Sequence, residues 1–318
     1  MPVRLKTIPK ISKMKEIKEL KKNDVIIVGG SYAGLSAAMT LGRSLKKVLI
    51  IDAGNPCNKR TPHSHNFLTQ DGKTPSEISS LARGQVLKYK TVSLFNDIAI
   101  NGYKTSEGFE IITKSGEKFL GKKLLFSTGI KDIMPEIKGF AECWGISAIH
   151  CPYCHGYEFN GRKTGVISNG DDAFHYAQLI NNLTNDLTIL TSGKANFTNE
   201  QILKLKSHNI NIIENEIMEI EHKEGMVENV VFEDGIKIYF DALYSGLPFK
   251  HNSKIPMLLG CELTEQGYLK VDDMQRTNVK GIYACGDNTR PMRSVANAVY
   301  TGNLAGAALN MELTTESF

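Results

Sequence analysis

The segment Val25–Gly34, which reads VIIVGGSYAG, is the clearest structural signal in this chain of 318 residues. Its four β-branched residues predict a buried strand of a parallel sheet. The glycine-rich turn that follows opens a helical pattern at residues 35–39. Strand, turn and helix in this order match the fingerprint G-x-G-x-x-G of dinucleotide-binding folds, except that Ser31 replaces the second glycine. We therefore expect a cofactor pyrophosphate at this turn, with candidate contacts from Gly29, Gly30, Ser31, Ala33 and Gly34.

A second predicted strand, residues 48–51, supports this interpretation because it ends at Asp52. In dinucleotide-binding folds an acid about 20 residues beyond the fingerprint accepts a hydrogen bond from a ribose hydroxyl. Asp52 is therefore a candidate cofactor ligand. The alternative, a turn that needs glycine only for packing, explains neither the acid nor the second strand.

A similar but degenerate unit occurs later in the chain. Residues 163–167 predict a strand, residues 168–173 a turn, residues 174–183 a helix and residues 187–190 another strand. Ser168 stands where the first glycine is expected, and no acid or arginine cluster follows Leu190. The chain thus contains two predicted nucleotide-binding folds, the second without a clear clamp for a 2′-phosphate.

Other segments surround these two units. Strand-like residues 93–95, 109–112 and 118–120 are separated by Gly or Asn turns and predict a small inserted sheet. Residues 281–287 predict a strand that ends in Gly286-Asp287 before a helix at 296–309. An acid and a helix N-terminus at one place again suit a cofactor that carries phosphate or sugar.

The motif Cys151-Pro152-Tyr153-Cys154-His155-Gly156 lies just before the second unit. A C-x-x-C pair can close a disulfide, and a thiol at a helix N-terminus loses its proton more readily and becomes a nucleophile. Half of a zinc site and a c-type haem attachment are the alternatives. The remaining cysteines form no second C-x-x-C, which disfavours zinc, and haem attachment requires export. We therefore favour a redox dithiol, with His155 as a proton donor or acceptor.

Composition limits the classes of function. The chain is 41% hydrophobic and 23% charged, with a net charge of +4, and its excess lysines lie largely in the first 22 residues. This distribution gives no reason to expect nucleic-acid binding. No apolar run approaches the ~20 residues of a membrane span, and the N-terminus has no secretory core, so we expect a cytoplasmic protein. For residues 1–22 we expect a frayed extension or a short surface helix.

The polar segment between the predicted strands contains His63 and His65. Two histidines at this spacing are compatible with a metal site or with an acid–base group. We favour a loop that lies against the cofactor, and we predict no metal.

These residues together resemble the low-molecular-weight, flavin-dependent thioredoxin reductases over nearly the whole chain after Lys22. The resemblance rests on the fingerprint, Asp52, Ser127-Thr128-Gly129, residues 281–287 and Arg293-Ser294-Val295. A dithiol in the second nucleotide domain is specific to this family. The sequence Cys-Pro-Tyr-Cys-His-Gly is similar to a branch that includes fungal dithiol oxidases.

The resemblance implies an α/β fold with two Rossmann-like nucleotide-binding domains, the second inserted in the first. We expect an N-terminal extension at 1–23, an FAD-binding domain at 24–130 and 247–318, and a pyridine-nucleotide-type domain with the dithiol at 131–246. The resemblance implies that Cys154 meets the flavin and that Cys151 exchanges with the substrate. It adds further candidate FAD contacts, which are Asn66, Thr128, Gly129, Gly286, Asp287, Ser294 and Val295. Candidate contacts to the pyridine nucleotide are Gly170, Asp171 and Ala173.

The implied activity is transfer of electrons from NAD(P)H through flavin and the Cys151–Cys154 disulfide to a thioredoxin-like protein or a small disulfide. The implied assembly is a homodimer. Two departures keep alternatives open, because the arginines that usually bind NADPH are absent and the second glycine turn is imperfect. The donor can be NADPH, NADH or neither. The alternatives are a dithiol oxidase that uses oxygen, or a flavoprotein fed by a different donor.

Overall fold

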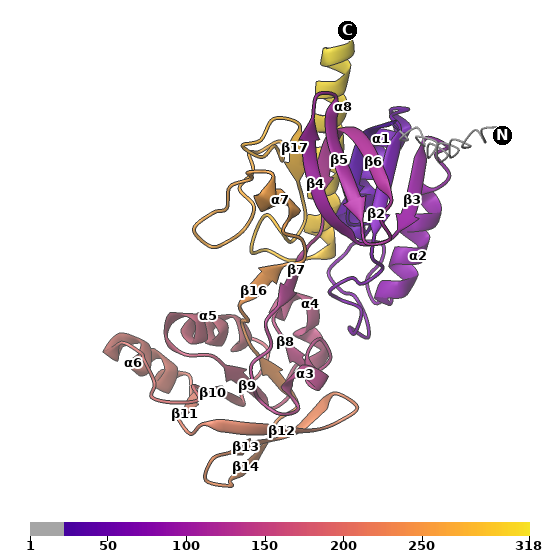
Figure 1. Cartoon of the computed structure of the whole chain (residues 1–318). Helices are drawn as coiled ribbons and strands as arrows, with labels where there is room; N and C mark the ends of the chain where they lie inside the picture. The colour runs from indigo at the N-terminus through magenta and orange to yellow at the C-terminus, as the bar shows by residue number, and fades with distance from the viewer. Residues whose placement is uncertain (1–21) are drawn as a thin grey trace, which may run out of the picture.

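The computed structural model describes residues 22–318 and contains two α/β domains, the second inserted in the first (Figure 1). The first 21 residues of the predicted N-terminal extension lie outside the described residues. Strand β1 begins at Lys22, two residues before the predicted start of the first domain. Within the described range, no helix combines the length and hydrophobicity needed to cross a bilayer.

A seven-stranded sheet forms the centre of the first domain, with the order β3-β2-β1-β6-β5-β4 and with β17 paired to β6. Strands β1, β2, β3, β6 and β17 are parallel, whereas β4, β5 and β6 pair antiparallel. The bounds are β1 (Lys22–Val28), β2 (Val48–Asp52), β3 (Val92–Asn96), β4 (Ala99–Thr105), β5 (Gly108–Thr113), β6 (Lys118–Phe126) and β17 (Ile282–Ala284).

Strand β6 corrects one expectation from the sequence. The predicted strands at 118–120 and from Leu124 are one continuous strand of nine residues, and residues 93–95 belong to the main parallel sheet. No separate inserted sheet of these segments occurs among residues 22–318; only the β4–β5 hairpin extends the main sheet. The continuity was not predicted because Gly121, Lys122 and Lys123 interrupt the apolar pattern. Lys123 is nevertheless buried, because it pairs with a carboxylate that is distant in the sequence.

Two helices cross on one face of this sheet. Helix α1 (Tyr32–Arg43) follows β1, and helix α8 (Val295–Ser317) is the last element of the described residues. They approach closely at Gly302, where an added Cβ would lie 2.1 Å from the carbonyl oxygen of Ala33. The hydroxyl of Ser36 donates to the carbonyl of Val299 at 2.7 Å. Helix α2 (Pro75–Val86) and the short α7 (Ile255–Leu258) complete the domain.

Helix α8 extends eight residues beyond the predicted end at Leu309. Its last turns are held by Lys123, whose ammonium lies 2.6 Å from carboxylate oxygens of both Glu312 and Glu316. Tyr283 also donates to Glu312. Contacts with a buried strand residue therefore continue the helix where the sequence alone shows only polar residues.

The inserted domain has a five-stranded parallel sheet with the order β11-β10-β9-β15-β8. Its strands are β8 (Ala148–Ile149), β9 (Thr164–Ile167), β10 (Leu187–Leu190), β11 (Asn211–Ile213) and β15 (Ala242–Tyr244). A three-stranded antiparallel sheet packs beside it, formed by β12 (Ile217–Lys223), β13 (Met226–Phe232) and β14 (Lys237–Tyr239). Its helices are α3 (Phe140–Cys143), α4 (Pro152–His155), α5 (Gly170–Ile180) and α6 (Asn199–Ser207), with a 3₁₀ turn η1 (Tyr157–Phe159).

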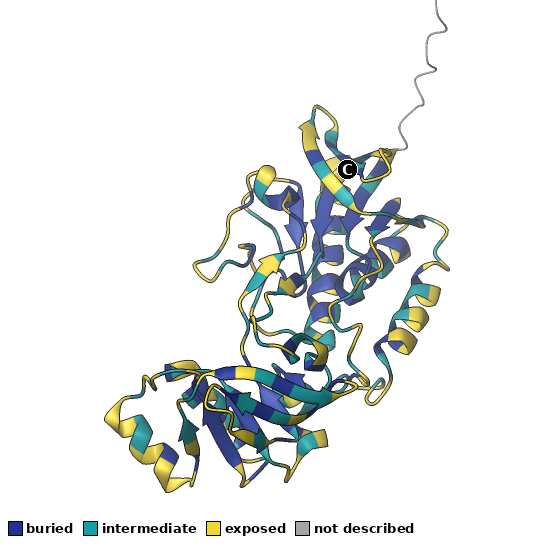
Figure 2. Cartoon of the chain, turned by 60° about the horizontal axis from the view of Figure 1, so that its bottom comes forward, coloured by how far each residue is buried: buried dark blue, intermediate teal, exposed yellow. Residues whose placement is uncertain are grey.

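The domains are joined by two antiparallel strands, β7 (Ile130–Asp132) and β16 (Phe249–His251), which form the narrow connection between the two lobes of Figure 1. Each domain has its own buried core. In Figure 2 the buried residues lie within the two sheets and on the helix faces that cover them. The clusters of the first domain come from residues 25–126 and 255–313, and those of the inserted domain from residues 134–247.

Candidate active site

A cavity of about 410 Å³ lies where the strands of the first domain end, and the inserted domain covers part of it. The turns after β1, β2, β6 and β17 all contribute to its wall, which is where open parallel sheets bind their ligands. Most of the predicted cofactor ligands line it, namely Gly29, Gly30, Ser31, Ala33, Asp52, Thr128, Gly129, Gly286, Asp287, Ser294 and Val295. Cys154 and His155 reach the same cavity from the inserted domain.

The glycine turn is shaped by close backbone contacts. Gly29 has φ +104°, and a Cβ there would lie 2.3 Å from the carbonyl oxygen of Ser127. Gly34 does not line the cavity; its role is packing, because a Cβ there would lie 2.0 Å from the carbonyl oxygen of Gly29. Side chains at these positions would force the turn open.

The N-terminus of α1 is open toward the cavity. Ser31 is the N-cap residue, and its side chain makes no capping hydrogen bond. The first backbone N–H groups of α1 therefore face the cavity together with the positive end of the helix dipole. This arrangement fits a bound pyrophosphate.

Asp52 is held in position by two partners. Its Oδ1 accepts from the backbone N–H of Gly30 at 3.0 Å, and its Oδ2 lies 3.1 Å from Nη2 of Arg83. Arg83, which comes from α2, was not predicted as a partner of Asp52. A carboxylate fixed in this way presents its remaining lone pairs to a ribose hydroxyl.

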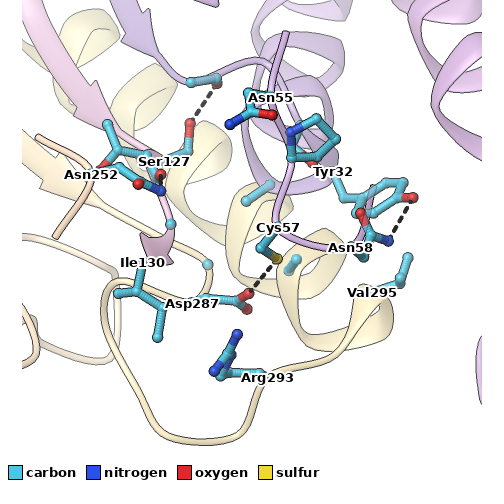
Figure 3. A pocket seen from close by; sticks show the side chains of 18 of the residues that line it. Tyr32, Asn55, Cys57, Asn58, Ser127, Ile130, Asn252, Asp287, Arg293 and Val295 are labelled. Atoms are coloured by element: carbon cyan, nitrogen blue, oxygen red, sulfur yellow. Dashed lines mark hydrogen bonds between the residues drawn. The ribbon is translucent and has the colours of Figure 1, made fainter. Parts of the chain in front are cut away.

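Asp287 provides an independent sign of a missing ligand. Its Oδ1 is buried without a hydrogen-bond partner, and its Oδ2 lies 3.8 Å from Sγ of Cys57 (Figure 3). Burial raises the pKa of the Asp287 carboxyl, and nearby Arg293 opposes that shift. An unpaired buried acceptor at a cavity wall is satisfied by a donor from a bound molecule. The glycine cradle, the open helix end and this orphaned oxygen together fit a flavin dinucleotide.

Cys57 lines the cavity in Figure 3 but was not predicted as a site residue. Burial, and then the neighbouring Asp287, raise the pKa of its thiol to about 11. The thiol is exposed and lies on the cavity wall. It remains a neutral thiol against the cofactor space.

The dithiol lies on the short helix α4. Cys151 is its N-cap residue and Pro152 its first residue, as the motif predicted. The hydrogen bond from the Cys154 thiol and the backbone N–H groups of Cys154 and Tyr153 lower the pKa of Cys151 to about 7, although burial opposes the shift. The pKa of Cys154 is raised by its bond to Cys151 and by burial. The stable state is therefore a Cys151 thiolate beside a Cys154 thiol.

The two sulfurs face different surroundings. Cys154 lines the cavity, whereas Cys151 does not. Cys151 lies instead near Tyr176 and Tyr244 of the inserted domain. Burial raises the pKa of both phenols, and the negative charge of the Cys151 thiolate raises it further. Tyr176 donates to the backbone carbonyl of His150 at 3.0 Å, immediately before the motif.

His155 and His65 meet beside Cys154. Their ring centroids are 6.4 Å apart with an edge-on orientation. Burial lowers the pKa of His155, Glu158 opposes that shift and His65 adds to it, so the uncharged imidazole is favoured overall. His65 lies on the cavity wall, in agreement with a loop against the cofactor, whereas His63 is exposed. No group of three His, Cys, Asp or Glu residues suited to a metal ion occurs between residues 22 and 318.

A buried ion pair between Arg293 and Asp132 connects the first domain to the joining strand β7. Arg293 Nη1 lies 2.7 Å from Oδ1 of Asp132, and Nη2 lies 3.2 Å from Oδ2. Trp144 of the inserted domain also donates to Asp132 at 3.1 Å. The predicted ligand Asn66, like Gly34, does not line the cavity; it lies on an outer groove. The positive φ of Asn66, +59°, turns the loop away from the cavity at this point.

The predicted pyridine-nucleotide residues lie apart from the cavity, at the start of α5. The side chain of Asn169 occupies this helix end, where it accepts from the N–H groups of Gly170 and Asn196, both at 2.8 Å. The loop after β10 covers it, since Asn169 also donates to the carbonyl of Lys194. Asp171 and Asp172 add negative charge to the first turn. This turn therefore does not offer the open phosphate site of α1.

Comparison with known proteins identifies the family. Residues 23–302 match the model of the pyridine nucleotide-disulphide oxidoreductase family. The chain is 31% identical to the thioredoxin reductase tcpT of Claviceps purpurea over 304 residues, which cover 92% of this chain and 95% of the relative.

Two solved structures are similarly close. An oxidoreductase from Agrobacterium tumefaciens has a TM-score of 0.87 at 36% identity, over 93% of this chain and 99% of the other. A putative thioredoxin reductase from Bacillus anthracis has a TM-score of 0.88 at 32% identity, over 93% and 100%.

The chain therefore belongs to the pyridine nucleotide-disulphide oxidoreductase family and is an oxidoreductase of the thioredoxin reductase-like type. Membership of this family implies the use of flavin and of a nicotinamide nucleotide. The two-domain fold expected from the sequence is confirmed by these relatives and by the strand order.

Proposed function

We propose that this protein is an FAD-dependent disulfide oxidoreductase that exchanges electrons between bound flavin and the Cys151–Cys154 pair. The observation that carries the proposal is that Cys154, next to a stabilised thiolate, lines the same cavity as the dinucleotide cradle. The proposed acceptor is a thioredoxin-like protein or a small disulfide, and the proposed donor is NAD(P)H. We further propose a cytoplasmic homodimer.

Bound flavin supplies two-electron transfer between a donor and the disulfide. The residues that would hold it are the α1 turn for the pyrophosphate, Asp52 for the ribose, and Asp287 for a donor group of the cofactor. The inserted domain covers part of this space and brings Cys154 to its wall.

The dithiol provides the exchange chemistry. Cys151, as thiolate, attacks a substrate disulfide and forms a mixed disulfide, and one substrate thiolate leaves. Cys154 then loses its proton and attacks Cys151, which releases the second substrate thiol. Because Cys151 lies outside the cavity, we propose that the inserted domain turns about β7 and β16 to present it to a protein substrate.

An anaerobic titration tests the proposal. The purified protein is mixed with NADPH, NADH or dithiothreitol, and bleaching of the flavin absorbance is followed. Bleaching by dithiothreitol in the wild type and its loss in Cys154→Ser would support electron exchange between dithiol and flavin. Bleaching at the wild-type rate in Cys154→Ser would contradict it.

One observation favours a second function, oxidation of dithiols. Asn169 and two carboxylates occupy the helix end where the inserted domain would bind a nucleotide phosphate. If neither nucleotide bleaches the flavin and a dithiol does, electrons enter at the cysteines. Oxygen consumption with peroxide formation in the presence of dithiothreitol would then identify oxygen as the acceptor.

A further inference from the structure

His65 lies where two cavities and two domains meet. His65 and Cys154 line both the cofactor cavity and an outer groove of about 260 Å³. The other residues of the groove are Asn66, Asp71, Tyr153, Tyr157 and Glu158. His65 comes from the loop after β2, in the first domain, whereas Cys154 comes from the inserted domain. The wall shared by the groove and the cavity therefore contains one sulfur of the dithiol and one imidazole.

Two carboxylates flank the His65 ring. Nδ1 lies 3.5 Å from Oδ2 of Asp71, which belongs to the same loop. Nε2 lies 3.4 Å from Oε1 of Glu158, which belongs to η1 of the inserted domain. The other titratable groups beside the ring are His63, His155 and Cys154. The protonated ring therefore makes two ion pairs, one of them between the domains.

His155 is poorly suited to supply protons on its own. It follows Cys154 directly and lines the cavity, but desolvation of its half-buried imidazole lowers its pKa and favours the uncharged form. An uncharged imidazole must receive a proton before it can protonate a thiolate. The His65 ring lies edge-on at 6.4 Å between centroids, a separation that one water molecule can bridge. His65 also lines the outer groove.

We infer that His65 is a proton-relay residue, which passes a proton through His155 to Cys154 when the Cys151–Cys154 disulfide opens. In that step the S–S bond breaks, two electrons arrive from a reductant, Cys151 becomes a thiolate, and Cys154 takes one proton. His65 is then reprotonated from the groove. Closing the disulfide runs the same transfers in reverse. The inference rests on the proposed function, because it requires a redox-active dithiol.

The relay also depends on the arrangement of the domains. His65 and its partner Glu158 lie on different domains, so the relay is complete only while Cys154 faces the cofactor cavity. A rotation of the inserted domain separates His65 from Cys154 and breaks the ion pair. Proton transfer is thereby confined to the arrangement in which electrons are exchanged with the cofactor.

The test measures opening of the oxidised cysteine pair by dithiothreitol in the full chain, anaerobically, at pH values from 6 to 9. Samples are quenched with iodoacetamide, and alkylation of Cys151 and Cys154 is quantified by mass spectrometry. The variants are His65→Gln, His155→Gln, the double variant and Glu158→Gln. The matched control is His63→Gln, two residues away on the same loop, whose ring faces Gly72 and not the dithiol.

We expect His65→Gln to open about tenfold more slowly than the wild type at pH 6. The two rates should converge at pH 9, where imidazoles in general no longer carry the second proton. Loss of thiolate from dithiothreitol at low pH affects both proteins equally and cancels in their ratio. Glu158→Gln should also slow opening at pH 6, because it removes a partner that orients the His65 ring, and His63→Gln should match the wild type. The double variant should be no slower than His155→Gln, because both residues act in one relay.

Three results would overturn the inference. The first is a ratio of the wild-type rate to the His65→Gln rate that stays constant with pH, which indicates a structural defect. The second is additive slowing in the double variant. The third is that His63→Gln slows opening as much as His65→Gln does. Failure of the proposed function looks different, since the wild type itself would then show no opening by dithiothreitol. If His65→Gln fails to fold, Glu158→Gln, whose side chain is 39% exposed, carries the same test through slower opening at pH 6.

Discussion

At the scale of single residues, the reactivity of this protein depends on the hydrogen bond between the two thiols of the motif. The bond from Cys154 is the largest contribution that lowers the pKa of Cys151 to about 7. At pH 7 about half of Cys151 is thiolate, against about one per cent for a thiol with the ordinary pKa of 9. Since a lowered pKa favours the charged form, this reactivity is present above about pH 7 and is lost as pH falls.

We predict that Cys154→Ala raises the pKa of Cys151 by about one unit or more, because alanine cannot donate a hydrogen bond. The measurement is the pH dependence of Cys151 alkylation by iodoacetamide in the reduced protein. Cys154→Ser is the matched control, since its hydroxyl keeps the donor and should keep the profile near that of the wild type. Equal profiles for the alanine and wild-type proteins would show that the helix backbone alone stabilises the thiolate.

At the scale of elements, the end of α8 depends on one buried cation. Lys123 is only 4% exposed and pairs with Glu312 and Glu316. Burial acts to raise the pKa of Glu312, but the hydrogen bonds from Lys123 and Tyr283 outweigh it and lower the pKa overall. A carboxylate with a lowered pKa stabilises the folded state above its unfolded pKa, and this contribution is lost as pH falls through the folded value.

We predict that Glu312→Gln lowers the free energy of unfolding at pH 7 by about 1–2 kcal/mol. Most of the difference from the wild type should disappear near pH 3, where Glu312 of the wild type is also protonated. Thermal unfolding at both pH values measures this. The control is Glu316→Gln, whose carboxylate is 44% exposed and should contribute less than about 1 kcal/mol. An equal loss for Glu312→Gln at both pH values would rule out the ion pair as the cause.

At the scale of the whole molecule, the two domains have separate cores. The buried clusters of the inserted domain contain residues from 134 to 247 and none from the first domain. The ends of the insertion lie side by side, because β7 pairs with β16. A segment with its own core and adjacent ends meets the requirements of an independent folding unit.

We predict that residues 131–246 alone fold cooperatively and bind no flavin. Residues 24–130 joined to 247–318 by a short glycine-serine linker should bind flavin, because every predicted pyrophosphate and ribose contact lies in that part. Circular dichroism, thermal unfolding and flavin absorbance test both fragments. Flavin bound by the inserted fragment, or an unfolded inserted fragment, would contradict the predicted domain boundaries of 131–246.

Local sequence patterns predicted much of the site, because the geometry of each pattern depends on residues that are close together in the chain. The turn at Gly29 needs a residue that tolerates φ +104°, and the C-x-x-C spacing places both thiols on one helical turn. Arg83 on Asp52, Asp132 on Arg293 and Glu158 on His65 were not predicted. The two residues of each pair are far apart in the chain. The charge of a residue does not indicate which distant residue it will pair with.

The sequence by itself determined the two nucleotide-binding folds, the Cys-x-x-Cys pair at a helix start and the lack of an open phosphate site in the second fold. These features follow from periodicity, glycine and cysteine spacing, which depend on neighbouring residues only. The tertiary structure alone decided that Cys154 faces the cofactor cavity and Cys151 does not, that Asn169 fills the second helix end, and that His65 bridges the domains. Each of these depends on the packing of segments more than about 20 residues apart, which long-range burial and charge pairing fix only in the folded chain.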